Sequence, residues 1–189
     1  MKYFIFSLFV FPFCFWGQFQ FSFSDSIQVI SNNTALNMPW AGGLNYPQLS
    51  SIDYDFDGDL DLLVFDRSSN QLKVFEHKIG AQGHFYDYDH NGAQWFPQDL
   101  RYRLFAIDYD GDQRKDLFAY GIGGLKVYRN TGDVISGLSW QVAEEILYSD
   151  NWGTSLNLYV SSTDIPAIVD VDGDGDIDVL TFHIGGEYL

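Results

Sequence analysis

Three short stretches of the chain carry aspartates at or near every second position. They are Asp53–Asp61 (DYDFDGDLD), Asp108–Asp116 (DYDGDQRKD) and Asp170–Asp178 (DVDGDGDID). Two like charges at contact distance repel each other by about 1 kcal/mol in water and by about 4 kcal/mol at the effective dielectric of a protein surface. Acids crowded in this way indicate a bound cation. Their recurrence in three places argues against chance.

Calcium is the cation that these loops favour. It takes six to eight hard oxygen ligands in flexible geometry, whereas magnesium keeps several of its waters. An EF-hand begins with the same spacing but needs a glutamate at its twelfth position, and Val64, Ala119 and Thr181 stand there. A plain acidic turn remains the alternative for any one loop, because Asp and Gly are common in turns.

Strand-like runs recur around each loop. Runs at 46–52, 103–107 and 165–169 precede the loops, and runs at 62–65, 117–120 and 179–182 follow them. A third strand is predicted at 71–76 and 124–129, and a fourth at 84–88 and 138–142. The runs after the loops are apolar at consecutive positions, which predicts strands that are covered on both faces. No long segment has helical periodicity, so the sequence predicts an all-β fold.

The repeat length suggests the architecture. The first aspartates of the loops are residues 53, 108 and 170, so the repeat is 55 and then 62 residues long. Four antiparallel strands in such a repeat describe a β-propeller blade. We therefore expect a partial β-propeller of about two and a half four-stranded blades, with the Asp-rich calcium loops between strands. The expected divisions are a lead-in segment with a first strand at 18–45, blades at 46–100 and 101–160, and an incomplete blade at 161–189.

The loops, together with Gly121–Gly132 (GIGGLKVYRNTG), resemble FG-GAP/VCBS repeats, the calcium-binding blades also found in integrin α-subunit propellers. The segments Pro39–Gln48 and Trp95–Pro97 resemble large secreted repeat proteins of Bacteroidetes-type bacteria. That family forms rings of about seven blades. The resemblance therefore implies that this chain is an N-terminal piece of a longer protein.

The resemblance also implies the ligands of up to three Ca²⁺ ions. Side-chain oxygens would come from Asp53, Asp55, Asp57 and Asp61, from Asp108, Asp110, Asp112 and Asp116, and from Asp170, Asp172, Asp174 and Asp178. Backbone carbonyls would come from Asp59, Arg114 and Asp176.

The sixth loop position needs a sharp turn with positive φ, which glycine adopts readily. Gly58 and Gly175 meet this need, but Gln113 stands in the second loop. Arg114 and Lys115 also add positive charge there. The second site is therefore predicted to be the weakest. A further stretch, Asp87–Gly92, begins like a fourth loop, but its ninth position is Trp95, and we expect it to be a plain turn.

The N-terminus predicts export. Residues 1–17 contain one basic residue, Lys2, and then an almost unbroken apolar run, which is typical of a secretory signal peptide. The run is shorter than the ~20 residues that span a bilayer and contains Pro12, so no membrane insertion is expected after the signal is removed. The single cysteine, Cys14, leaves with the signal. A secreted or cell-surface domain without disulfides needs another stabilising cross-link, such as a structural metal ion.

Charge and motifs restrict the function. The net charge is −16, and fourteen of the 26 acids lie in the three loops, so nucleic acid and anionic membranes are poor partners. The four histidines are scattered and no catalytic motif is present, so we do not expect an enzyme. The abundant aromatic residues, including Trp40, Trp95, Trp140 and Trp152, are expected to fill space between blades. We predict a propeller scaffold for adhesion or for recognition of an extracellular protein or glycan. The alternative is a non-catalytic accessory region of a larger extracellular, carbohydrate-active enzyme.

Overall fold

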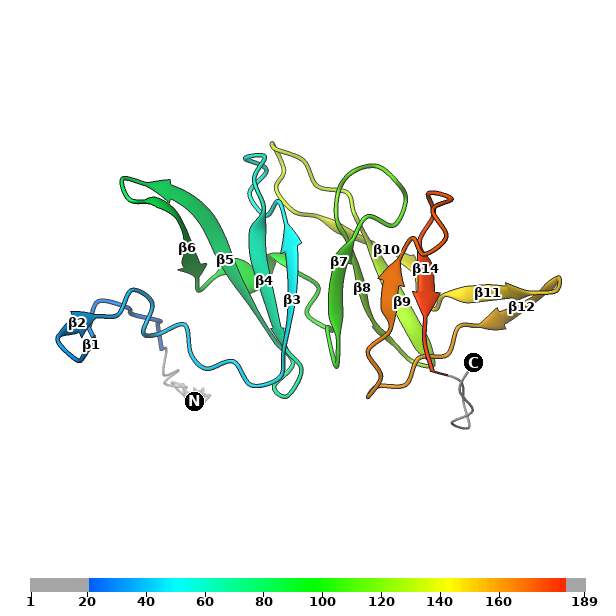
Figure 1. Cartoon of the computed structure of the whole chain (residues 1–189), viewed down its shortest axis with the longest axis horizontal. Helices are drawn as coiled ribbons and strands as arrows, with labels where there is room; N and C mark the ends of the chain where they lie inside the picture. The colour runs from blue at the N-terminus through cyan, green and yellow to red at the C-terminus, as the bar shows by residue number, and fades with distance from the viewer. Residues whose placement is uncertain (1–20, 183–189) are drawn as a thin grey trace, which may run out of the picture.

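The chain is all-β in a computed structural model that describes residues 21–182 (Figure 1). The described residues form strands and one short 3₁₀ helix but no α-helix. None of their helices is long and apolar enough to cross a bilayer. The predicted signal peptide at 1–17 and the end of the third repeat, 183–189, lie outside the described residues.

Two four-stranded antiparallel sheets form the body of the molecule. The first sheet contains β3 (Pro47–Ile52), β4 (Asp61–Asp66), β5 (Gln71–Gly80) and β6 (Gly83–Asp89) in that order. The second sheet contains β7 (Leu104–Ile107), β8 (Asp116–Gly121), β9 (Gly124–Asn130) and β10 (Trp140–Glu144) in the same order. The third hairpin pairs β13 (Ala167–Val169) with β14 (Asp178–Leu180). All ten strand positions predicted from the sequence are confirmed.

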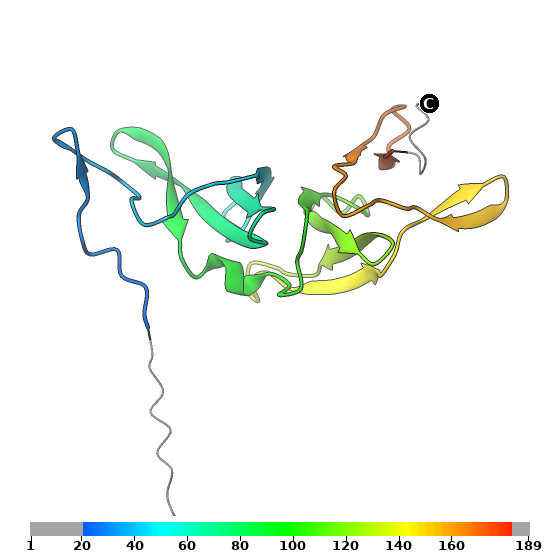
Figure 2. The ribbon, with the colours of Figure 1, turned by 90° about the horizontal axis from the view of Figure 1, so that it is seen from below.

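Five elements were not predicted individually. A small hairpin, β1 (Ile30–Ser31) with β2 (Thr34–Ala35), lies in the lead-in segment, and the 3₁₀ helix η1 (Gly92–Trp95) follows β6. A second hairpin, β11 (Tyr148–Asn151) with β12 (Thr154–Asn157), lies between β10 and β13 and projects away from the sheets (Figure 2). It occurs in the longer of the two repeats.

Two hydrophobic cores join the sheets face to face. The first core lies between the first and second sheets and includes Leu63 and Phe65 from β4 with Leu117 from β8. The second core lies between the second sheet and the third hairpin and includes Phe118 and Ile168. Successive side chains of a strand point to opposite faces, so neighbouring residues of β8 enter different cores. The prediction that this apolar run is covered on both faces is confirmed.

Side chains of the first sheet also bind the edge of the second. β3 and β7 are edge strands, and an edge strand presents unpaired backbone groups. The Leu104 N–H donates to Gln48 Oε1 (3.1 Å), and the Ala106 N–H donates to Ser50 Oγ (3.3 Å). The first strands of successive sheets therefore lie side by side.

The expectation that the tryptophans fill space between sheets is correct for Trp140 only. Trp140 is partly buried against the first core and stacks on Phe96 at 5.6 Å between ring centroids. Trp40 and Trp95 are 42% and 52% exposed, and Trp152 is fully exposed at the turn between β11 and β12. The expectation failed because these three side chains lie outside the two sheet interfaces, in the lead-in segment and in the connections between sheets.

Candidate metal centres

Each aspartate loop connects the first two strands of its sheet. The loops join β3 to β4, β7 to β8 and β13 to β14. All three lie along the same edge of the molecule (Figure 1). The same stretch of sequence therefore occupies the same place in three successive repeats.

Three aspartates gather in each loop. In each group, one carboxylate oxygen per residue lies within 4.8 Å of the others. The groups are Asp53, Asp55 and Asp57; Asp108, Asp110 and Asp116; and Asp170, Asp172 and Asp178. Each offers only carboxylate oxygens, which suit hard cations such as calcium.

The first loop has an oxygen that a cation would satisfy. Asp53 Oδ1 is buried and has no hydrogen-bond partner within residues 21–182. A buried polar atom without a partner costs about 1–3 kcal/mol, and more when it is charged. The aspartates of the loop therefore fit a cation, which would restore the missing interaction of Asp53.

The first aspartate of each loop organises the backbone. The N–H of the sixth residue donates to it in all three loops, from Gly58 to Asp53 (3.2 Å), from Gln113 to Asp108 (2.8 Å) and from Gly175 to Asp170 (3.1 Å). The loops therefore share one backbone fold as well as one composition.

The sixth position adopts the predicted left-handed conformation in every loop. Its φ is +93° at Gly58, +72° at Gln113 and +96° at Gly175. The prediction that this position needs positive φ is confirmed, and Gln113 meets the need at a steric cost that glycine avoids.

The fourth position has the same requirement, which the sequence analysis did not identify. Its φ is +62° at Phe56, +76° at Gly111 and +80° at Gly173. The signal was the glycine at this position in two of the three loops. The first and second loops therefore each hold one non-glycine residue in a left-handed conformation.

The ninth aspartate holds its loop to the sheet. Asp61 is 1% exposed and accepts hydrogen bonds from the N–H groups of Tyr54 (2.7 Å) and His77 (2.7 Å). Tyr54 is the second loop residue and His77 lies on β5. The carboxylate therefore fastens the loop to the third strand. Burial raises the pKa of Asp61.

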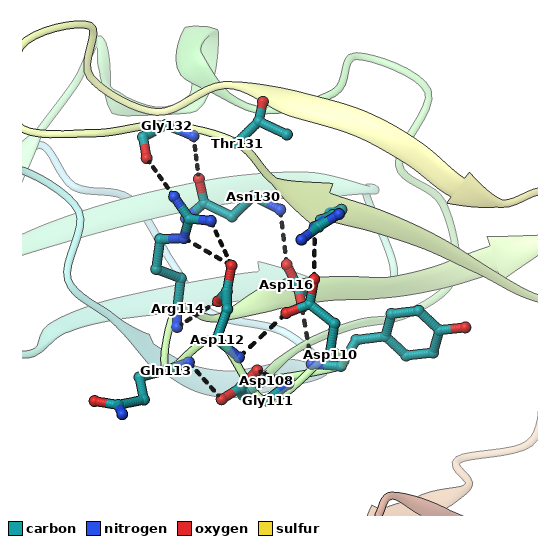
Figure 3. Close-up of polar contacts among 12 residues, drawn as sticks. Asp108, Asp110, Gly111, Asp112, Gln113, Arg114, Asp116, Asn130, Thr131 and Gly132 are labelled. Carbon is teal, nitrogen blue, oxygen red and sulfur yellow. Dashed lines mark hydrogen bonds and ion pairs between the residues drawn. The ribbon is translucent and has the colours of Figure 1, made fainter.

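Asp116 does the same in the second repeat. It is fully buried and accepts N–H groups from Tyr109 (2.8 Å) and from Asn130 (2.7 Å) on β9 (Figure 3). Burial raises its pKa as well. In the third loop, Asp178 accepts the Val171 N–H (2.8 Å).

Three side chains that were predicted as ligands lie outside the three groups, namely Asp61, Asp112 and Asp174. The Asp59 side chain binds His77 Nδ1 at 2.6 Å, and His77 Nε2 lies 2.9 Å from His84 Nδ1. In the third loop, Asp174 Oδ1 accepts the Asp176 N–H at 3.1 Å. The groups consist of side-chain atoms, so the backbone carbonyls predicted from Asp59, Arg114 and Asp176 stay predictions.

Two arginines bind aspartates of the second loop. The Arg114 guanidinium folds back onto Asp112 through Nε (3.0 Å) and Nη2 (Figure 3). This hydrogen bonding lowers the pKa of Asp112. Arg129 Nε lies 2.5 Å from Asp110 Oδ2. A metal cation in this loop would therefore compete with two guanidinium groups for the carboxylates of Asp110 and Asp112.

The role of Arg129 was missed because it depends on strand pairing. When Leu72–Val74 of the first repeat is aligned with Leu125–Val127 of the second, Glu76 is the residue equivalent to Arg129. That alignment was visible in the sequence, but only the fold brings the third strand next to the loop. The first loop thus has an acid where the second has a base.

The stretch Asp87–Gly92 runs from the end of β6 through a turn at His90 and Asn91 to the start of η1. Asp89 ends β6 and accepts hydrogen bonds from the Tyr54 hydroxyl (2.8 Å) and the Asn91 N–H (2.8 Å). Its acids form no group of three potential ligands among the described residues. The turn predicted in this stretch is confined to His90 and Asn91.

Comparisons of the chain with protein-family models, with curated proteins and with solved structures found no match.

Proposed function

We propose that this chain is a secreted repeat protein in which calcium ions bind the aspartate loops and stabilise β-propeller blades. The observation that carries the proposal is that three aspartates gather in the loop between the first two strands of each of three successive repeats. A single acidic turn has a simple alternative explanation. Three turns with the same backbone hydrogen bonds do not.

The calcium has a structural role in this proposal. Ile52 and Leu63, on the strands either side of the first loop, are each 1% exposed in the first core. A calcium ion that neutralised the aspartates of the loop would therefore stabilise the two strands whose side chains form the core. Extracellular calcium modules bind at roughly 10⁻⁴–10⁻³ M, concentrations found outside cells.

Propeller architecture accounts for the arrangement of the sheets. The first two sheets are four-stranded meanders, their first strands lie side by side, and their faces pack through one core. These features, with the resemblance to FG-GAP/VCBS repeats, support successive blades around an axis.

The scaffold would serve adhesion or recognition without catalysis. Its net charge of −16 disfavours nucleic acid as a partner. An extracellular protein or glycan is the class of ligand that we propose. The ligand would bind to a rigid scaffold whose calcium ions stay bound throughout.

Thermal unfolding with 1 mM calcium and with excess EDTA tests the calcium sites. A site occupied at ten times its Kd adds about 1.4 kcal/mol, so three sites raise Tm by roughly 10 °C. The matched control is the triple variant Asp55→Asn, Asp110→Asn and Asp172→Asn, which should lose this response. Equal Tm values for the wild type in calcium and in EDTA would refute the proposal.

A further inference from the structure

The outer edge of the first sheet is a free strand. β6 pairs with β5 on one side, and no strand within residues 21–182 pairs with its other side. The register of the β5–β6 pair runs without a shift from Gly80 opposite Gly83 to Val74 opposite Asp89. Neither a bulge nor a proline interrupts β6, although both are common means of protecting an edge strand. The edge is therefore open to pairing.

Three residues of β6 turn their backbone groups toward this edge. The His77 N–H donates to Asp61 Oδ1 (2.7 Å), so it does not bond to Tyr86, its partner across the β5–β6 pair. Hydrogen-bonded and non-hydrogen-bonded pairs alternate along antiparallel strands, so His84 and Tyr88 stand in the same position as Tyr86. The N–H and C=O groups of these three residues therefore point away from β5. Within residues 21–182 they form no backbone hydrogen bond to another segment.

Two cavities adjoin this edge, between β6 and the lead-in segment. The smaller, of about 220 Å³, is lined by residues 87–88 of β6, and the larger, of about 590 Å³, by residues 83–87. Neighbouring residues of a strand point to opposite faces, so a cavity lined by both lies at the edge of the strand. Asn37, Met38 and Asp87 line both cavities. The two cavities therefore form one groove along β6, and the lead-in segment, which runs past the outer side of the β5–β6 hairpin in Figure 2, forms its other wall.

The smaller cavity is acidic and aromatic. Two acids and three aromatic rings line it, namely Asp25 and Asp87 with Phe23, Trp40 and Tyr88. No Lys, Arg or His is among the described residues that line it, and neither acid forms an ion pair in that part of the chain. Trp40 donates its indole N–H to the Ile27 carbonyl (2.9 Å), which leaves the face of the ring for a ligand. Carboxylates and aromatic ring faces both attract an organic cation such as a guanidinium group.

We propose that the edge of β6 binds an extended segment of a partner protein, which adds to the first sheet as a fifth strand and places a basic side chain in the smaller cavity. In this mode of recognition, main-chain hydrogen bonds supply affinity and pockets for single side chains supply specificity. A second copy of this chain fits less well, because the lead-in segment obstructs a whole sheet and two chains of net charge −16 repel each other. The proposal rests on the recognition role proposed above and names the class of its ligand.

Fluorescence anisotropy at saturating calcium tests this site. The probes are fluorescein-labelled heptapeptides Thr-X-Thr-Arg-Thr-X-Thr with blocked ends, where X is Val, Ile, Phe or Tyr, because such residues favour an extended strand. We expect saturable binding, and replacement of the Arg by Glu should weaken it about tenfold or more. If no peptide binds saturably up to about 1 mM, or if the Glu peptides bind equally well, the proposal is overturned.

Backbone methylation of the best peptide tests strand addition without any protein variant. Only one edge of the added strand faces β6, so the N–H groups of alternate residues bond to it. N-methylation of two residues on that edge should abolish binding, whereas N-methylation of two residues on the other edge should preserve it. Equal effects of the two patterns would show that the peptide does not bind as a strand.

Protein variants then locate the site. Tyr86→Pro removes an outward N–H without breaking the β5–β6 pair, so it should weaken peptide binding about tenfold or more. Tyr86→Thr loses the same side chain but keeps the N–H, and it should retain binding. Asp25→Asn combined with Asp87→Asn should remove the preference for Arg over Glu.

The calcium response of Tm separates this proposal from the preceding one. A protein whose Tm rises with calcium but that binds no peptide refutes the peptide site alone. Tyr86→Pro that keeps the calcium response and binds peptide as the wild type does overturns it too. A dimer that Tyr86→Pro disrupts, in a protein that binds no peptide, would assign the edge to a second copy instead.

Discussion

Gln113 is a residue whose side chain conflicts with its backbone conformation. A non-glycine residue in the left-handed region destabilises the folded state by roughly 1–2 kcal/mol. Replacing it with glycine removes this strain, but the greater conformational freedom of glycine in the unfolded chain cancels about 0.4–1 kcal/mol of the stability gained. We expect Gln113→Gly, at φ +72°, to raise the free energy of unfolding by about 0.5–1 kcal/mol. Urea unfolding in EDTA measures this change. Gln113→Ala is the control and should bring no gain; an equal gain would show that backbone strain is not the cause.

The charge of the side chain beside each loop should affect how tightly that loop binds calcium, with a positive charge weakening the binding. Arg129 binds Asp110 in the second loop, and the equivalent residue in the first repeat is Glu76. Arg129→Glu removes a competing cation, so we expect calcium to bind the second loop about fivefold to tenfold more tightly, which corresponds to about 1–1.4 kcal/mol. Calorimetric titration measures it in a background where Asp55→Asn and Asp172→Asn disable the other two loops.

The reciprocal change is the matched control. Glu76→Arg places a cation beside the first loop and should weaken calcium binding there by a similar factor, measured with Asp110→Asn and Asp172→Asn. If both reversals leave affinity unchanged, solvent screens these charges, and the predicted weakness of the second site must then come from Gln113.

At the scale of the strand and its loop, the ninth aspartate has a role that is independent of calcium. Asp61 accepts two backbone N–H groups, from Tyr54 and His77. Asn presents one oxygen and one NH₂ group, so Asp61→Asn leaves one buried N–H unpaired and should cost about 1–3 kcal/mol even in EDTA. Asp55→Asn is the comparison, since it should lower stability only when calcium is present. Chemical unfolding with and without EDTA separates the two, and equal behaviour of both variants would contradict this role.

The strands themselves were predictable because their signals are local. Runs of apolar residues bounded by loop residues placed all ten predicted strands. β11 and β12 were missed because their large apolar residues are exposed, 61% for Tyr148 and 46% for Leu156, so no pattern of burial marks them. A hairpin without a buried face leaves little signal in a sequence.

At the scale of the molecule, the two cores should make the described sheets unfold together. Leu117 is 0% exposed in the first core, and its neighbour Phe118 is 1% exposed in the second. Leu117→Ala and Phe118→Ala should each cost about 2–5 kcal/mol and shift one common transition, because β8 belongs to both cores. Circular dichroism and tryptophan fluorescence should then give coincident curves. Two separate transitions in either variant would show that the cores are independent.

The sequence alone determined the repeat, the ten strands around the aspartate loops and the acidic loops themselves, since each follows from residues close together along the chain. Charge repulsion, turn conformation and alternating burial act over a few residues, and their pattern can be read without a fold. Only the tertiary structure decided which charges stand beside each loop, because Arg129 and Glu76 arrive on a third strand through sheet pairing. The same holds for the edge of β6, which the lead-in segment borders. Contacts between distant segments depend on packing geometry, and no local pattern encodes them.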